Sequence, residues 1–194
     1  MTGDPRTARG GVVPGAGVLG MWVFLASLAV LFIAAIVGFL IVRLRADGGP
    51  PTAPLRLPIG MWAATMVLLA GSVSIHRALH AIRGGRQTAC SRLLAVALVL
   101  GVLFLAVQSW NWWELIRRSL TASSNLGAFT FFMLTGLHAA HVIGGFALLA
   151  IVWERSRRGR YDGQLHSGVT YAAMYWHFLD GVWLVLFAVL FTLA

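Results

Sequence analysis

The sequence has no lysine and few charged residues of any kind. Only 11% of its 194 residues are charged, and its fifteen basic residues, all arginine, outnumber six acidic ones. An ordinary soluble domain carries roughly 25% charged residues. So few charges cannot cover a soluble surface, whereas 59% of the residues are hydrophobic. Most side chains must therefore face lipid.

Cysteine is almost absent too. Cys90 is the only one, which excludes a disulfide within the chain and a cysteine-based metal cluster. The net charge of +9 is no sign of nucleic-acid binding, because the arginines lie between apolar runs, where membrane proteins keep cytoplasmic charge. The first apolar run is too long for the core of a cleavable signal peptide, so we expect it to remain as a helix.

Five apolar runs are each long enough to cross a bilayer as a helix, which takes about 20 residues. Helices are expected because lipid offers no partner to open backbone groups. The sequence thus predicts an all-α integral membrane bundle at residues 17–194, preceded by a cytoplasmic tail at residues 1–16. The five spans are expected at residues 18–42, 57–75, 93–113, 126–153 and 169–194.

Arginine counts predict the orientation of the bundle. The N-terminal tail and the second and fourth loops together hold ten arginines, against five on the other side. Cytoplasmic loops carry the excess of basic residues. We therefore expect the N-terminus inside and the C-terminus outside.

Polar residues inside the last two spans are the first candidates for a site. They are His138, His141, His177 and Asp180. The members of each pair, His138 with His141 and His177 with Asp180, are three positions apart and therefore share a helix face. From helix rise, His141 and Asp180 lie roughly 18 Å and 14 Å from the inner edge. A His–Asp contact between the two helices is expected, and its role is a polar clamp, a lipid or subunit contact, metal or haem ligation, or a proton relay.

A second polar group follows the second apolar run. His76 and His80 share a face beside Arg77 and Arg83, which is typical of an interfacial contact with lipid headgroups or a partner. Elsewhere, the pair Gly144-Gly145 favours close approach of two helices.

Two long motifs then carry a family resemblance. The segments are Thr-Gly-Leu-His-Ala-Ala-His-Val at residues 135–142 and Tyr-Trp-His-Phe-Leu-Asp-Gly-Val-Trp at residues 175–183. They resemble the Thr-Gly-x-His-x-x-His-Val and Tyr-Trp-His-Phe-x-Asp-x-Val-Trp motifs of subunit III of haem–copper oxidases. The segment at residues 20–27 and Gln108 are similar to further parts of that family, so the resemblance runs in order from about residue 17 to the end.

The resemblance implies the short, five-helix bacterial form of subunit III, in the inner membrane. Such a subunit holds no haem or copper and no other metal. It packs on the catalytic subunit I, near subunit II, binds structural phospholipid and supports proton uptake and turnover. Trp176, in the last motif, joins the residues expected in the clamp or in lipid and subunit contacts.

Two positions depart from the family pattern. Leu28 and Asn111 stand where the family has glutamates, which casts doubt on any proton-related role of those acids. The favoured function is an accessory, non-catalytic subunit of an oxidase that reduces oxygen to water with cytochrome c or quinol as donor. The alternatives are a subunit III relative associated with nitric oxide reduction, an independent membrane cytochrome and a small transporter.

Overall fold

The computed structural model describes residues 16–44, 58–118, 121, 126–164 and 166–193. Five helices fill almost all of these ranges, and no strand occurs in them, which confirms the all-α prediction. Residues 1–15 of the predicted N-terminal tail and residues 45–57 before the second helix lie outside the described residues. The helices are α1 (Ala16–Leu44), α2 (Gly60–Arg83), α3 (Gln87–Arg117), α4 (Leu126–Arg157) and α5 (Ser167–Leu193).

Helix α2 extends well beyond the expected end of its apolar run at residue 75. The extra two turns remain helical because one side of them is still buried, through Ala78, Ala81 and Ile82. His76 and His80 are consequently part of the helix, and both are exposed on its opposite side. The histidines follow the apolar run in the sequence, but the helix continues past them, since one buried face is enough to continue a helix whose other face is polar.

Tight turns join the helices at one end of the bundle. After α2, the amide of Arg86 donates to the carbonyl of Ala81 over 2.8 Å, and Gly85 takes a φ of 70°. Gly159 has a φ of 73° just after α4. Glycine reaches this left-handed region without the steric cost that a side chain adds, so both helices can end abruptly there.

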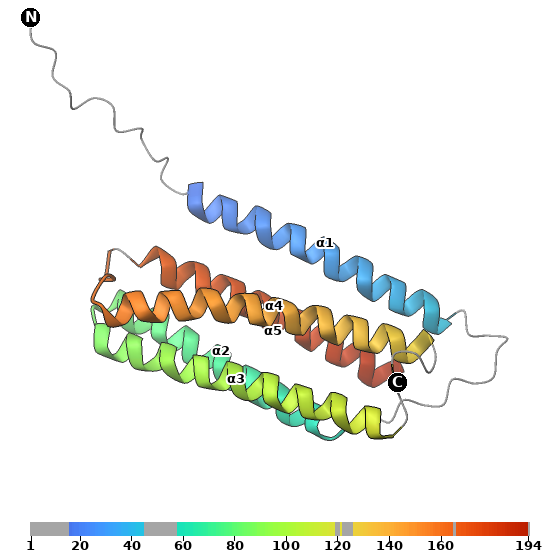
Figure 1. The fold of residues 1–194 in the computed structure, drawn as a ribbon. Coiled ribbons are helices and arrows are strands. Elements are labelled where there is room, and N and C mark those ends of the chain that lie inside the picture. Colours follow the sequence, from blue (N-terminus) through green and yellow to red (C-terminus); the bar gives the residue numbers. More distant parts are fainter. Residues whose placement is uncertain (1–15, 45–57, 119–120, 122–125, 165, 194) are drawn as a thin grey trace, which may run out of the picture.

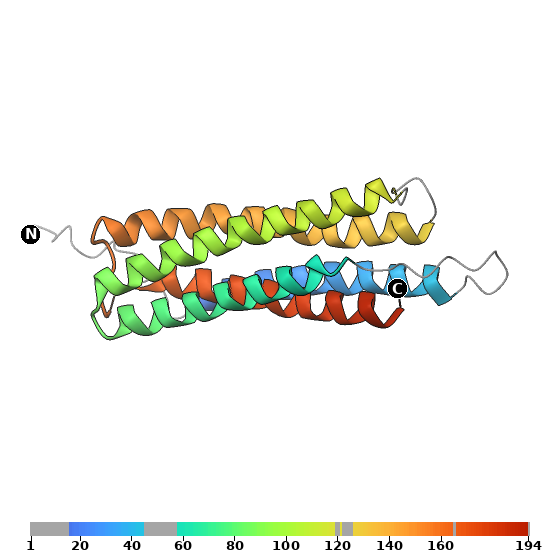
Figure 2. The ribbon, with the colours of Figure 1, turned by 90° about the horizontal axis from the view of Figure 1, so that it is seen from below.

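The helices form three layers that run nearly parallel to one long axis. Figure 1 shows α1 along one side, α4 and α5 in the middle and α2 with α3 on the other side. Seen from below in Figure 2, α3 lies beside α4, and α2 lies on the side of α5. Within the described residues α1 touches α4 and α5 alone, whereas α2 and α3 pack closely as a hairpin.

Helix α1 is attached by one narrow seam. Its buried residues, Leu25, Phe32 and Phe39, recur every seven positions, so they fall on one stripe of the helix. Most of the other side chains of α1 are exposed or only partly buried. The main core lies instead among the other four helices, where Phe104, Phe131 and Trp183 are fully buried.

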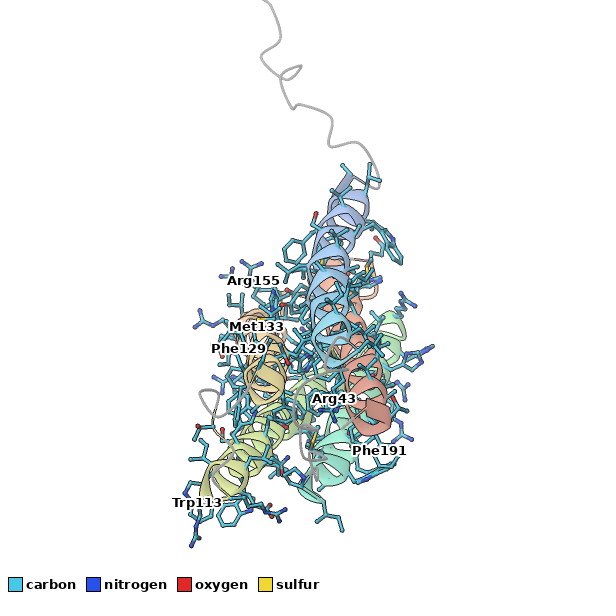
Figure 3. The ribbon with its side chains drawn as sticks, turned by 90° about the vertical axis from the view of Figure 1, so that its right-hand side faces the viewer. Arg43, Trp113, Phe129, Met133, Arg155 and Phe191 are labelled. Atoms are coloured by element: carbon cyan, nitrogen blue, oxygen red, sulfur yellow. The ribbon has the colours of Figure 1, made fainter. Side chains whose placement is uncertain are left out.

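Large apolar side chains cover the outside of the bundle. Phe129, Met133 and Phe191 are labelled on its surface in Figure 3, and all three are exposed. Each of the five helices is long and apolar enough to cross a membrane. A surface of this kind would aggregate in water but suits the hydrocarbon of a bilayer.

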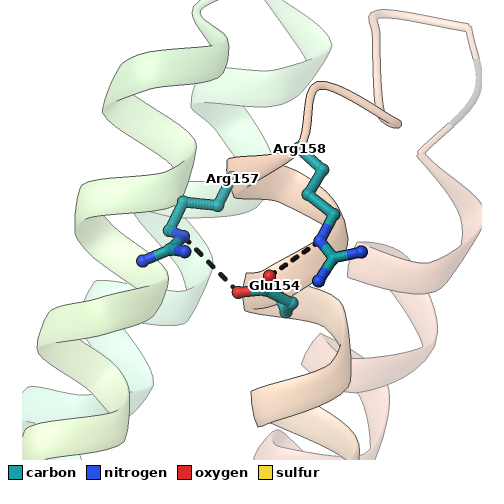
Figure 4. Close-up of polar contacts among 3 residues, drawn as sticks. All are labelled: Glu154, Arg157 and Arg158. Carbon is teal, nitrogen blue, oxygen red and sulfur yellow. Dashed lines mark hydrogen bonds and ion pairs between the residues drawn. The ribbon is translucent and has the colours of Figure 1, made fainter.

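Charged pairs lie at the helix ends. Near the end of α4, the carboxylate of Glu154 accepts from Arg158 at 2.7 Å and lies 3.4 Å from Arg157 (Figure 4). At the end of α3, Arg118 donates to Glu114. Exposed pairs of this type contribute little to stability. Their position at the ends leaves the apolar middle of each span facing lipid.

Candidate functional site

His138 occupies the centre of the four-helix core. Its ring is fully buried and lies 5.0 Å from Trp183, 5.9 Å from Phe104 and 6.3 Å from Phe32, measured between ring centroids. Neither ring nitrogen has a hydrogen-bond partner among the described residues. An imidazole enclosed in this way packs as an aromatic ring, joining α4 to α1, α3 and α5.

His141 lies one turn further along α4 and connects to a different set of groups. Its Nδ1 donates to the carbonyl of Leu137 over 2.7 Å, and its ring lies 5.1 Å from Phe32. The hydroxyl of Tyr175 donates to the backbone carbonyl of His141 over 3.0 Å. The two histidines of α4 thus both contact Phe32, and the link between α4 and α5 at this level comes from Tyr175.

Asp180 is paired within its own helix. Its carboxylate, only 5% exposed, lies 3.7 Å from Nδ1 of His177, which is also 2.8 Å from the hydroxyl of Ser72 on α2. Neither carboxylate oxygen of Asp180 has a hydrogen-bond partner among the described residues. The prediction that Asp180 contacts the histidines of α4 was therefore wrong. Equal depth brings two residues to one level but does not turn them toward each other, and the ring of His138 meets Trp183 instead.

The two polar groups expected separately come together between α2 and α5. The ring centroid of His76 lies 4.7 Å from that of His80 and 6.1 Å from that of His177. Arg77 is exposed on the same part of α2. Sequence reasoning placed each group correctly on its own segment but had no signal for their contact, because about 100 residues separate them.

Two tryptophan–threonine bonds were missed by the sequence reasoning. Nε1 of Trp183 donates to Thr65 over 3.0 Å, and Nε1 of Trp112 donates to Thr135 over 3.1 Å. Each threonine hydroxyl also donates to a carbonyl one turn earlier in its own helix. These bonds connect α5 to α2 and α3 to α4. The one available signal was that buried tryptophan nitrogens need acceptors.

The positions that depart from the family pattern are both in packed surroundings. Asn111 is fully buried, and its side-chain nitrogen lies 3.5 Å from the side-chain oxygen of Gln108. Asn111 also lies against Gly60, where a Cβ would come within 2.1 Å of the amide oxygen. Leu28 is partly buried and packs on the hydrophobic core.

Trp176 lies against a glycine of α3. Its ring is buried, and a Cβ on Gly101 would come within 3.2 Å of it. Its ring nitrogen is buried with no hydrogen-bond partner among the described residues. In the part of the chain that the structure describes, no three side chains of His, Cys, Asp or Glu are grouped as a metal site would require.

Comparison of the sequence with known proteins identifies the family of this chain. Residues 11–194 match the model of the family described as cytochrome c oxidase subunit III. Two cyanobacterial proteins named cytochrome c oxidase subunit 3 are each 30% identical. The one from Synechocystis sp. aligns with 93% of this chain and 77% of its own length, and the one from Thermostichus vulcanus with 91% and 87%. The subunit of the same name from Oryctolagus cuniculus is 37% identical over 71% of this chain and 50% of its own length. This chain therefore belongs to the cytochrome c oxidase subunit III family, as a multi-pass membrane protein.

Proposed function

We propose that this chain is an accessory, non-catalytic subunit of a haem–copper terminal oxidase in the inner membrane of a bacterium. The observation that carries the proposal is the family match over residues 11–194. The principal partner is then the catalytic subunit I, with subunit II nearby. Haem and copper belong to those partners, and the complex reduces oxygen to water and translocates protons.

The buried motif residues support a structural role for this chain. Thr135, His141, Tyr175 and Trp183 each make or receive a hydrogen bond that connects two helices. Such bonds hold a fixed arrangement of spans, although each contributes only about 0.6 kcal/mol on average in a membrane. A bundle fixed in this way can present a constant surface to subunit I and support its proton uptake and sustained turnover.

A bound phospholipid is the second part of the proposal. Two hollows of about 560 Å³ and 380 Å³ lie along α1 and α5, and both are lined by Ala29, His177 and Phe178. The rest of their lining is almost entirely apolar, from Trp22 at one end to Val185 at the other. An elongated apolar groove of this kind fits the acyl chain of a lipid.

Gentle detergent purification of the tagged chain from its native membrane tests the proposal. We expect a catalytic subunit I and a copper-bearing subunit II to be identified among the co-purifying chains, and oxygen consumption in the purified complex. Nitric oxide consumption without oxygen consumption would instead indicate the reductase relative. A Soret band in the chain purified alone, lost on replacing His138 or His141, would contradict the accessory role.

A further inference from the structure

The exposed sides of α2 and α5 share a basic face in a bundle that is otherwise apolar on the outside. We define the basic face as the exposed residues His76, Arg77, His80 and His177. The outer surfaces of α1 and α4 carry large apolar side chains in their middle turns, such as Val30 and Ile143. The basic face is therefore a local departure from the lipid-facing surface.

Parts of the basic face lie well inside the membrane-spanning region. From helix rise, His76 is roughly 10 Å from the end of α2 at Arg83, and His177 is roughly 15 Å from the start of α5 at Ser167. Ionisable side chains at such depth are costly in hydrocarbon and normally face protein or water. Long arginine side chains near the helix end can reach the headgroups, but the short imidazole of His177 cannot.

His177 has one ring nitrogen occupied and one available. Nδ1 lies 2.8 Å from the hydroxyl of Ser72 and 3.7 Å from Asp180. These contacts fix the ring between α2 and α5, while 40% of the His177 side chain remains exposed. Both contacts use Nδ1, so Nε2 of His177 can serve a partner.

The arginine of the basic face, Arg77, has no acidic partner among the described residues, and the carboxylate of Asp180 lies 3.7 Å from Nδ1 of His177. Asp180 is buried beneath His177, while Glu114 and Glu154 pair with arginines at the ends of α3 and α4. A guanidinium and three imidazoles present donors, and the group that complements them best is a carboxylate. A lipid phosphate would lie at the headgroup level, beyond the depth of His177.

We propose that the basic face docks a transmembrane helix of catalytic subunit I that presents an aspartate or glutamate at the depth of His177. This inference rests on the proposed function and adds to it the surface and the chemistry of the contact. The partner carboxylate accepts from Nε2 of His177 and lies among His76 and Arg77. Ser72 and Asp180 act as positioning residues, since they hold the imidazole of His177 in place.

Photo-crosslinking in the native membrane tests the contact. A photoreactive phenylalanine analogue replaces Val73, which is 51% exposed beside His76 and Arg77, and in a control strain it replaces Ile143, which is 58% exposed on α4. We expect a protein adduct from position 73, mapped by mass spectrometry to a spanning segment of subunit I that contains an acid. Adducts with lipid alone from position 73, or a subunit I adduct from position 143 only, would overturn the inference.

Substitutions then test the role of the charges. His177→Leu and Arg77→Gln are each expected to weaken retention of the chain in the complex by about threefold to twentyfold, the range of interhelical polar contacts. His177→Gln keeps a donor and should retain more of the chain than His177→Leu. Replacing the crosslinked acid of subunit I by its amide should cause a loss that His177→Leu does not increase. If the two substitutions together caused a loss of the chain equal to the sum of their separate losses, direct pairing would be contradicted. Failure of the wild-type chain to co-purify with subunit I would instead refute the proposed function.

Discussion

Gly145 is a point of close approach between α4 and α5. A Cβ at this position would lie 2.6 Å from Cε1 and 3.1 Å from Cδ1 of Tyr175, and 3.5 Å from a methyl group of Leu179. Carbon atoms pack best at about 3.5 to 4.0 Å. Gly145→Ala must therefore push the ring of Tyr175 away by roughly 1 Å, or separate the two helices.

The cost of that displacement follows from three contributions. Overpacking costs about 1 to 3 kcal/mol, and loss of the bond from Tyr175 to the carbonyl of His141 adds about 0.6 kcal/mol. Replacing a helical glycine by alanine acts in the opposite direction and stabilises the helix by up to about 1 kcal/mol. We expect Gly145→Ala to lower the free energy of unfolding by about 0.6 to 2.6 kcal/mol when the full gain in helix propensity is realised.

Gly136 supplies the matched control in the same helix. A Cβ there meets nothing within 4 Å, so Gly136→Ala keeps the gain in helix propensity without the clash. Unfolding of the purified chain in mixed micelles, followed by circular dichroism as SDS is added, should separate the two variants by about 1.5 to 3.5 kcal/mol. Equal stability of the two variants would refute the close packing of Gly145 on Tyr175.

Three further predictions concern the core, the membrane and the lost acid. Trp183→Phe should cost at least about 1 kcal/mol, because it removes the bond to Thr65 and leaves a cavity in place of part of a fully buried ring. A double-mutant cycle with Thr65→Val should give a coupling of about 0.6 kcal/mol in the same SDS titration; a coupling of zero would contradict the bond. Reporter fusions at Thr2 and after Ala194 should report from opposite sides of the membrane, with the N-terminus inside; two fusions on one side would exclude five spans. Leu28→Glu should assemble at a cost of at most about 2.5 to 3.5 kcal/mol, the insertion penalty of a central acid, and should leave proton pumping and turnover lifetime unchanged; a clear rise in either would show that Leu28 marks a lost proton-handling site.

The helices could be predicted from the sequence because each span is specified locally. Length and apolar composition are properties of one segment, so α1 and α4 were located to within a few residues. The end of α2 was harder, since its last turns have a mixed composition and stay helical through burial of Ala78 and Ala81 against the rest of the bundle. Burial of that kind depends on tertiary contacts that no single segment contains.

The site was predicted less fully than the fold. Motif residues such as His138 and Asp180 were identified as buried, and both are. The shared face of His177 and Asp180 was predicted from their spacing, but the partner of His138 on α5 was not, because the rotation of each helix about its own axis decides whether the ring of His138 meets Asp180 or Trp183. Contacts between distant segments, such as Trp183 with Thr65 and His76 with His177, carry no local pattern at all.

The single seam of α1 has a consequence for how the protein is made. Of the five described helices α1 is synthesised first, yet the described structure gives it contacts with α4 and α5 alone. During synthesis, α1 lacks its packing partners in the membrane until about a hundred further residues have been inserted. Helices α2 and α3, in contrast, can form their hairpin as soon as both are inserted. The seam residues of α1, which are Leu25, Phe32 and Phe39, then pack against the bundle last. Nascent α1 is thus exposed to membrane chaperones and quality-control proteases for longer than the other described spans. Substitutions in its seam should therefore lower the amount of protein that accumulates more than they alter the structure of the assembled bundle.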